Sequence, residues 1–184
     1  MIMGAEPVVC FDKAAVSDIP IIRSLAAEIW HECYPSIISA KQIDYMLGLM
    51  YSEAVLRSEL SDPAYEYYIV RNCSEAVGYV GLLHEAKPDR TKLTKLYLKA
   101  SQHGKGIGKK MMEYAKSLAL DHGSEDVYLQ VNKRNATAIK AYLQSGFAIE
   151  REAEFDIGGG FVMDDYVMVC RLDGYIRNPQ DCAL

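Results

Sequence analysis

The chain has 184 residues, half of them hydrophobic, which suffices for one well-buried domain and is too short for two ordinary ones. Its formal net charge of −5 does not indicate the basic surface that nucleic-acid binding requires, and it mildly favours cationic or neutral partners. We expect a single domain over residues 1–172 and a polar tail over residues 173–184.

The cysteine pattern gives an indication of the cellular compartment. Five cysteines are scattered along the chain, with no Cys-x-x-Cys spacing, so they indicate neither a disulfide framework nor a zinc site. A reducing, cytoplasmic location fits this pattern. The N-terminal stretch lacks a basic region followed by a long apolar run, and no segment approaches the roughly 20 apolar residues of a membrane span. We therefore expect a soluble protein with no membrane partner; its oligomeric state stays open, with a homodimer as one option.

The first third of the chain is expected to form one strand followed by helices. Val8, Val9 and Phe11 predict the strand. Ser17 is a suitable N-cap for the first helix, with Pro20 tolerated in its first turn. The apolar stripe of that helix consists of Ile22, Leu25, Ala26, Ile29 and Cys33. Helical spacing returns over residues 43–50, and a further helical run is expected over residues 55–60.

The rest of the chain alternates strands and helices. Residues 65–70 and 76–83 predict an antiparallel hairpin, and residues 87–90 a turn into a strand at 93–98. Beyond it we expect a helix that stops at Gly123, a strand over 127–131, a helix over 135–144, and final strands over 147–155 and 161–172 joined across three glycines. A helix between two strands implies a parallel pair, whereas hairpins imply antiparallel neighbours. The expected fold is therefore α/β with a mixed sheet.

A glycine-rich loop joins the strand at 93–98 to the following helix. Gly104, Gly106 and Gly108 let the backbone approach a ligand closely, and the first N–H groups of the helix have no partner within it. The helix dipole favours an anion there, and Lys105, Lys109 and Lys110 would add positive charge. The loop therefore predicts a phosphate site. The alternative is a tight strand-to-helix turn that binds nothing.

Two familiar phosphate loops do not fit. In a P-loop a glycine precedes Gly-Lys-Ser/Thr by five residues, but here His103 stands at that place and Lys110 replaces the hydroxyl residue. A dinucleotide fingerprint has the spacing G-x-G-x-x-G in the first βα unit, whereas this loop reads G-x-G-x-G in mid-chain. Nucleotide hydrolysis and NAD binding are both disfavoured.

The loop resembles motif A of the GNAT superfamily of acyl-CoA-dependent N-acetyltransferases, Arg/Gln-x-x-Gly-x-Gly/Ala, with His103 in place of the Arg or Gln. A second block is also similar, running from Asn132 through Asn135 and Tyr142 to Gly146-Phe147. The resemblance covers nearly the whole chain. It implies a mixed, mostly antiparallel central sheet in which strands 4 and 5 splay apart, flanked by about four helices.

The resemblance also implies where coenzyme A binds. The pyrophosphate would lie on backbone N–H groups of the glycine loop, and the pantetheine arm would pair with the free edge of strand 4, as an added strand does. The residues implied in acetyl-CoA binding are Leu96, Tyr97, Leu98, His103, Gly104, Lys105, Gly106, Ile107, Gly108, Lys109, Asn132, Asn135 and Tyr142.

Acyl transfer to an amine needs a base, a donor to the developing oxyanion and an acid for the thiolate. By resemblance, a backbone N–H near Leu98 would serve the oxyanion and Tyr142 the thiolate. The identity of the general base stays open, because residues 94–97 contain no carboxylate, whereas many relatives carry one on strand 4. Glu32, His84 and Glu85 are the candidates, although His84 also fits a plain strand end. No histidine has metal-ligand spacing, so no metal is expected.

The resulting hypothesis is an acetyl-CoA-dependent N-acetyltransferase whose acceptor is the primary amine of a small, polyamine-like molecule or of a protein. The negative net charge suits a cationic acceptor, and the connection near Tyr34 would wall its pocket. Two alternatives stay open: a protein N-terminal acetyltransferase of the ribosomal type, and a non-catalytic acyl-CoA-binding or sensing domain. The missing carboxylate on strand 4 favours the latter.

Overall fold

The structure, a computed structural model, describes residues 9–86 and 89–175. Three parts of the predicted organisation lie outside the described residues: Val8 in the first strand, residues 87–88 of a turn, and residues 176–184 of the tail.

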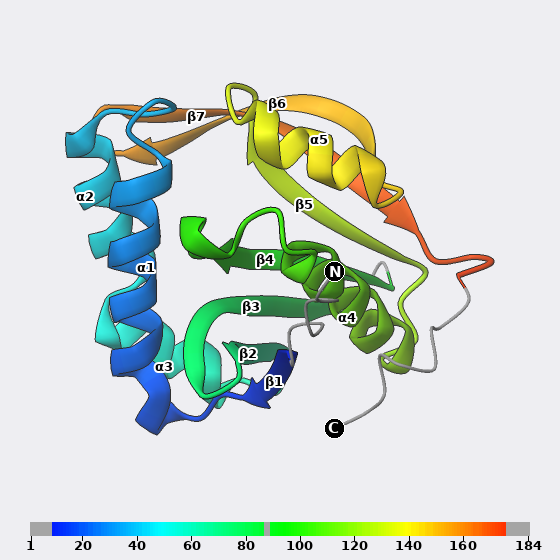
Figure 1. Cartoon of the computed structure of the whole chain (residues 1–184). Coiled ribbons are helices and arrows are strands. Elements are labelled where there is room, and N and C mark those ends of the chain that lie inside the picture. Colours follow the sequence, from blue (N-terminus) through cyan, green and yellow to red (C-terminus); the bar gives the residue numbers. More distant parts are fainter. Residues whose placement is uncertain (1–8, 87–88, 176–184) are drawn as a thin grey trace, which may run out of the picture.

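Within the described residues, seven strands form one sheet in the order β1-β2-β3-β4-β5-β7-β6 (Figure 1). The strands are β1 (Val9–Lys13), β2 (Tyr65–Asn72), β3 (Glu75–Glu85), β4 (Arg90–Leu98), β5 (Asp126–Asn132), β6 (Ala148–Gly158) and β7 (Phe161–Arg171). All neighbouring pairs are antiparallel except β4 and β5, which are parallel. The predicted mixed, mostly antiparallel sheet is confirmed.

The described part holds five α-helices rather than about four. They are α1 (Ile19–Cys33), α2 (Ala40–Met50), α3 (Glu53–Ser61), α4 (Ile107–Asp121) and α5 (Ala136–Gln144). The run over residues 55–60 is a helix of its own because Ser52 accepts a hydrogen bond from the N–H of Val55 and starts it afresh after α2.

The predicted N-cap at Ser17 is wrong. Ser17 lies inside a short 3-10 turn (Val16–Asp18), and Asp18 is the residue that precedes α1. Its carboxylate accepts the N–H of Ala15 at 2.9 Å and so closes the turn. Because Pro20 has no N–H, the start of α1 presents one donor fewer for a side chain to cap.

Two hydrophobic clusters hold the helices on opposite faces of the sheet (Figure 1). Met111 and Ala115 of α4 pack on one face, together with the inward side chains of β5 and β7. Ile22 and Trp30 of α1 pack on the other face, with α2 and α3 beside them. The helical spacing noted in the sequence marks these buried stripes.

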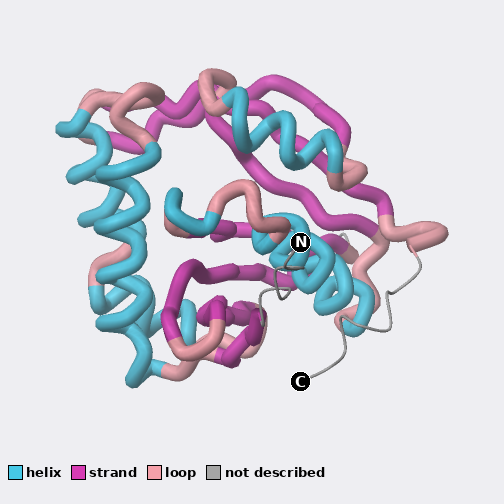
Figure 2. Tube along the Cα trace, in the orientation of Figure 1, coloured by secondary structure: helices cyan, strands magenta, loops and turns pink. Residues whose placement is uncertain are grey.

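The parallel strands β4 and β5 pair over three residues only, Arg90 to Lys92 with Asp126 to Tyr128. Beyond this start β5 runs away from β4, as Figure 2 shows. The predicted splay of strands 4 and 5 is confirmed. Thr94 adds a bulge on β4, since Leu82 opposes Leu93 while Gly81 opposes Lys95. A bulge increases local twist and so helps to turn the end of β4 away from β5.

The hairpin of β6 and β7 is tied to α2. The Tyr45 hydroxyl donates to the carbonyl of Ile157 at 2.7 Å. A Cβ at Gly158 would collide with this hydroxyl oxygen, and a Cβ at Gly159 would collide with the Tyr45 ring. Both glycines have positive φ, so the turn needs glycine for its backbone and for the close approach of Tyr45. This contact fixes the hairpin beside the helices of the first third.

None of the helices in the described part of the chain combines the length and the apolar character that crossing a membrane requires.

Candidate active site

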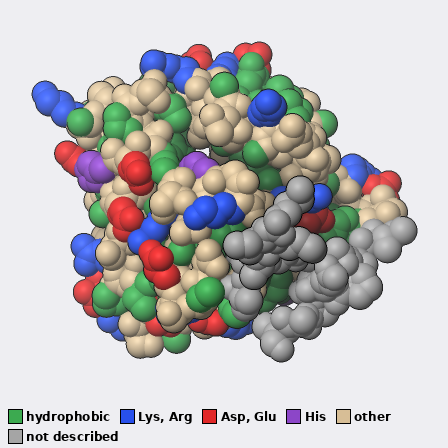
Figure 3. All heavy atoms as spheres, viewed as in Figure 1, with side chains coloured by type: hydrophobic (Ala, Val, Ile, Leu, Met, Phe, Trp, Pro, Cys, Tyr) green, Lys and Arg blue, Asp and Glu red, His purple; other side chains and the backbone are tan. Residues whose placement is uncertain are grey.

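A cleft of about 1160 Å³ opens where β4 and β5 part. Its walls come from the end of α1 and the connection to α2, from β4, from the glycine loop, and from the end of β5 with α5. Figure 3 shows the surface hollowed between α1 and α5. The predicted coenzyme-binding residues found in the lining are Leu96, Tyr97, Leu98, His103, Gly104, Gly106, Gly108, Lys109, Asn132, Asn135 and Tyr142.

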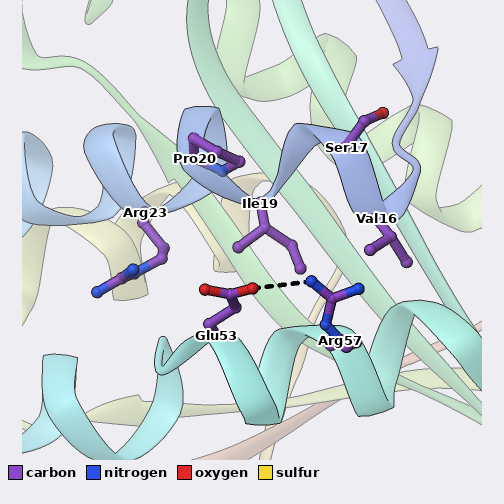
Figure 4. Close-up of a pocket in the computed structure, with 7 residues that line it drawn as sticks. All are labelled: Val16, Ser17, Ile19, Pro20, Arg23, Glu53 and Arg57. Carbon is purple, nitrogen blue, oxygen red and sulfur yellow. Dashed lines mark hydrogen bonds and ion pairs between the residues drawn. The ribbon is translucent and has the colours of Figure 1, made fainter.

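A smaller pocket of about 440 Å³ lies between the start of α1 and α3 (Figure 4). The guanidinium of Arg57 bonds the carboxylate of Glu53 one helical turn away, at 2.8 Å, and Arg23 lies at its rim. None of the predicted site residues lines it. The larger cleft is therefore the candidate active site.

The glycine loop presents unpaired donors to this cleft. Gly106 is the N-cap of α4 with φ of 80°, and the first helical bond runs from the N–H of Lys110 to its carbonyl. The N–H groups of residues 107–109 thus have no partner within the helix. A Cβ built on Gly104, Gly106 or Gly108 meets no atom within 4 Å, so the space beside the three glycines is open. The loop fits a pyrophosphate.

Side chains hold the loop in place. Nε2 of His103 lies 3.0 Å from the carbonyl oxygen of Leu98, which links the start of the loop to the end of β4. Nζ of Lys105 donates to Oε1 of Gln102 at 3.2 Å, and its side chain is outside the lining. Ile107 is also outside, because its side chain is fully buried in the core, leaving its N–H as the group available to an anion.

The free edge of β4 faces the splay. The N–H of Lys99 donates to the carbonyl of Val77, on β3, and bonded residues alternate along an antiparallel ladder. The N–H and C=O of Leu96 and Leu98 therefore point away from β3, towards the opening. The contact of His103 with the Leu98 carbonyl agrees with this direction. The edge can pair with an extended chain carrying amides.

The end of β5 and the start of α5 form the opposite wall. Oδ1 of Asn132 accepts the N–H of Arg134 at 3.0 Å, and Oδ1 of Asn135 accepts the N–H of Ala138 at 3.2 Å. Asn132 thus shapes the turn and Asn135 caps α5, while both asparagines line the cleft. Arg134 reaches across to the carbonyl of Ser36, in the connection after α1.

Tyr142 projects from α5 into the cleft. It is half-buried, and its ring packs edge-on against Phe147 at 5.7 Å between centroids. Burial raises the pKa of its phenol above the ordinary value, and the nearby Tyr34 raises it further. The hydroxyl therefore keeps its proton at neutral pH and is available as a donor.

Aromatic rings from α1 and β4 face Tyr142. Tyr34, at the C-cap of α1, stacks on Trp30 at 4.8 Å, and its ring lies 6.3 Å from that of Tyr97. Burial raises the pKa of Tyr34 to about 12, while hydrogen bonding with Tyr97 and Asn135 opposes this rise. Trp30, Tyr34, Tyr97 and Tyr142 thus form an aromatic part of the cleft lining, called the throat below.

The three candidate bases are not brought together. Glu32 lines the cleft and is exposed. His84 lies outside the lining: its Nδ1 is 2.8 Å from Oγ1 of Thr91, and its ring stacks on His122 at the end of α4. Glu85 is likewise outside and accepts the hydroxyl of Tyr128 at 2.7 Å. The side chains of His84 and Glu85 therefore connect neighbouring strands and the end of α4, and do not face the cleft.

The sequence analysis did not single out Asp165 on β7, a carboxylate that is fully buried and lies outside the cleft lining. A signal was present. In the strand sequence around Asp164-Asp165, alternation places Asp165 in step with Met163 and Val167, on an inward row. A charged side chain in such a row is unusual and needs an explanation. Among the described residues, no group of three or more His, Cys, Asp or Glu side chains could hold a metal ion.

Comparisons with known proteins agree with this geometry. A family model described as the acetyltransferase (GNAT) family matches residues 24–147. An uncharacterised N-acetyltransferase of Mycobacterium tuberculosis is 29% identical over 157 residues, covering 85% of this chain and 99% of the relative. The spermidine N(1)-acetyltransferase of Thermoplasma acidophilum is 25% identical over 156 residues, covering 83% of this chain and 93% of the relative.

Solved structures share the fold. The crystal structure of PaiA N-acetyltransferase from Thermoplasma acidophilum in complex with coenzyme A has a TM-score of 0.75 at 24% identity, covering 89% of this chain and 98% of that one. A chimera of the spermidine N-acetyltransferase SpeG from Vibrio cholerae and hSSAT has a TM-score of 0.69 at 19% identity, covering 92% and 99%. Because the family model spans well over half of its length, the chain belongs to the GNAT family and is an acetyl-CoA-dependent acyltransferase.

Proposed function

We propose that this protein transfers the acetyl group of acetyl-CoA to a primary amine of a small cationic molecule, with polyamines as the leading class. The observation that carries the proposal is the continuous path from the unpaired N–H groups at the start of α4, along the free edge of β4, to the hydroxyl of Tyr142. A ligand with a pyrophosphate at one end and amides along its arm matches this path.

The residues divide the chemistry among them. When bound, acetyl-CoA supplies a thioester whose carbonyl carbon can accept an amine. The N–H of Leu98 would donate to the carbonyl oxygen as negative charge develops there. The protonated hydroxyl of Tyr142 would donate to the leaving sulfur as negative charge develops there. Because burial raises the pKa of this phenol, stabilisation of the thiolate by the hydrogen bond matters as much as full proton transfer. Trp30 and Tyr34 would exclude water from the throat.

Three observations support a cationic acceptor. The chain carries a net charge of −5, one relative is named a spermidine acetyltransferase, and carboxylates from Glu32 and Glu59 lie in the lining on the acceptor side. Free cysteines at all four described positions support the proposed cytoplasmic setting.

A sensing role is the second candidate. Its support is the absence of a carboxylate at residues 94–97, where Lys95 is instead buried beside the ring of Tyr51. An enzyme that lacks a strand-4 base needs another group to take the proton of the amine.

A single assay separates the candidates. Acetyl-CoA is first titrated into the protein calorimetrically, and thiol release is then followed with spermidine, a neutral amino acid and a peptide with a free N-terminus. We expect acetyl-CoA binding and turnover fastest with spermidine. Turnover only with the peptide or the amino acid would refute the polyamine class, and binding without any thiol release would favour the sensing role.

A further inference from the structure

Lys95 is a buried cation in the wall of the candidate active site. It lies on β4, lines the cleft, and is only 5% exposed. Within the described residues its Nζ makes no hydrogen bond and pairs with no carboxylate; it lies 5.6 Å from the centre of the Tyr51 ring. A buried ammonium without a counter-ion is costly, so this group calls for a functional explanation.

Strand pairing places Lys95 on the face of the sheet that α1 and α3 cover. Tyr67 on β2 opposes Gly81 on β3, and Gly81 opposes Lys95 on β4. Opposite residues of antiparallel strands project from the same face, and Tyr67 packs in the cluster beneath these helices. A Cβ on Gly81 would lie 2.9 Å from Cγ of Lys95. The stem of the lysine therefore fills the space that the glycine leaves.

An acidic side chain and a hydroxyl accompany Lys95 in the cleft lining. Glu59 on α3 accepts the hydroxyl of Tyr67, which belongs to the same cross-strand row as Lys95. The hydroxyl oxygen of Thr94, at the bulge, is buried and has no hydrogen-bond partner among the described residues. Burial lowers the pKa of Lys95, and Glu59 acts in the opposite direction. A bound carboxylate would give the ammonium the partner that it lacks.

The position of Lys95 along β4 suits the far end of a short acceptor. Strands rise about 3.3 Å per residue, so Lys95 lies roughly 10 Å along the strand from Leu98, whose N–H would meet the acetyl group. In extended lysine about 7 Å separate the terminal nitrogen from the carboxylate, and a charge-assisted hydrogen bond adds about 3 Å. Tyr97, which lies between these two positions and lines the cleft, would cover the alkyl chain.

We propose that the acceptor is a diamino acid, with its terminal amine in the throat and its carboxylate on Lys95. Glu59 would receive the second ammonium at the same end of the cleft. This inference rests on the proposed function and narrows its small cationic acceptors. A diamino acid shares with a polyamine the primary amine on an alkyl chain and the net positive charge, and it adds the anion that Lys95 lacks. A polyamine of the same length leaves Lys95 without a partner.

The test compares two ligands that differ only in the carboxylate. L-lysine and cadaverine, which is lysine without its carboxylate, are each titrated calorimetrically into protein saturated with coenzyme A, and kcat/KM for acetyl transfer is measured for both. We expect the parent to favour lysine by about tenfold or more in both measurements, because the carboxylate gains a charge-assisted hydrogen bond. In Lys95→Met, which removes the charge and keeps an unbranched side chain, the preference should fall to within about threefold through weaker lysine binding alone.

Lys41→Met is the matched control and should keep the preference of the parent, because Lys41 is exposed and lies outside the cleft lining. Lys95→Gln repeats the comparison with a polar side chain, so that the result does not depend on the packing of one variant. Equal affinities in the parent, or a preference for lysine that survives both Lys95 variants, would overturn the inference and leave the proposed function standing. Preferential lysine binding without thiol release would refute the proposed function alone, and absence of binding by both amines would overturn both.

Discussion

Tyr142 is predicted to donate to the thiolate, and its position in the cleft lining is compatible with that role. It lines the throat, is half-buried, and keeps its proton because burial raises its pKa. Asn132 and Asn135, by contrast, have a structural role that the sequence did not indicate. Both side chains accept backbone hydrogen bonds that stabilise the turn into α5. Their contribution to ligand binding is inseparable from that turn.

Replacing Tyr142 with Phe should lower kcat about ten- to a thousandfold while leaving acetyl-CoA affinity nearly unchanged. The ring and its packing on Phe147 remain, and only the proton donor is lost. Tyr166→Phe is a suitable control, because that tyrosine packs against the same core but lies outside the cleft lining. Pre-steady-state thiol release measures the chemical step, and an unchanged rate in Tyr142→Phe would reduce Tyr142 to a packing residue.

Asp165 should make the free energy of unfolding depend on pH. Its pKa in the folded protein, about 6, exceeds the ordinary 3.8, so the folded state holds this proton more tightly and loses stability as pH rises from about 4 through about 6. Asp165→Asn abolishes this dependence. The difference in free energy of unfolding between the variant and the parent should therefore shift in favour of the variant between pH 4 and pH 7. We expect a shift on the order of 1–2 kcal/mol after allowance for screening by water. Urea denaturation at both pH values measures the gain, and a constant difference would contradict the account.

At the scale of elements, the decisive unit is β4, the glycine loop and α4. Gly106 and Gly123 lie at opposite ends of α4, with φ of 80° and 82° and open space where a Cβ would stand. Alanine at either position costs about 1 kcal/mol for the left-handed backbone. They differ in place, because Gly106 lines the cleft and Gly123 does not.

We therefore expect Gly106→Ala to weaken acetyl-CoA binding at least tenfold, as its methyl group enters the space of the pyrophosphate. Gly123→Ala should match it in thermal stability and keep the affinity of the parent within twofold. Calorimetric titration of both variants gives the comparison. Equal affinities would show that the loop does not hold the ligand.

Local pattern was sufficient to predict most elements. The period changes at the glycines, so β4 and α4 could be predicted from Leu93 to Ala119, and the hairpin of β2 and β3 from its alternation and its turn. The start of α1 was misplaced because the 3-10 turn before it depends on a backward contact of Asp18 with Ala15. Side-chain choice at a helix start is a weak signal where Pro20 removes a donor.

Across the whole molecule, the two faces of the sheet have separate duties. In the proposed function, the side of α4 and α5 would bind the phosphates, whereas α1, α2 and the hairpin of β6 and β7, which Tyr45 ties to α2, would wall the acceptor pocket. The splay is where the two meet. The burial of Asp165 could not be predicted from local pattern alone, because it depends on the pairing of β7 with β5 and on the elements that cover that face of the sheet.

The account is tested most directly by a crystal structure of the protein with coenzyme A and spermidine. We expect the pyrophosphate on the N–H groups of residues 107–109, the pantetheine amides on the edge of β4 at Leu96 and Leu98, and spermidine within the same cleft. Coenzyme A outside the splay, for example in the smaller pocket beside Arg23 and Arg57, would contradict the account.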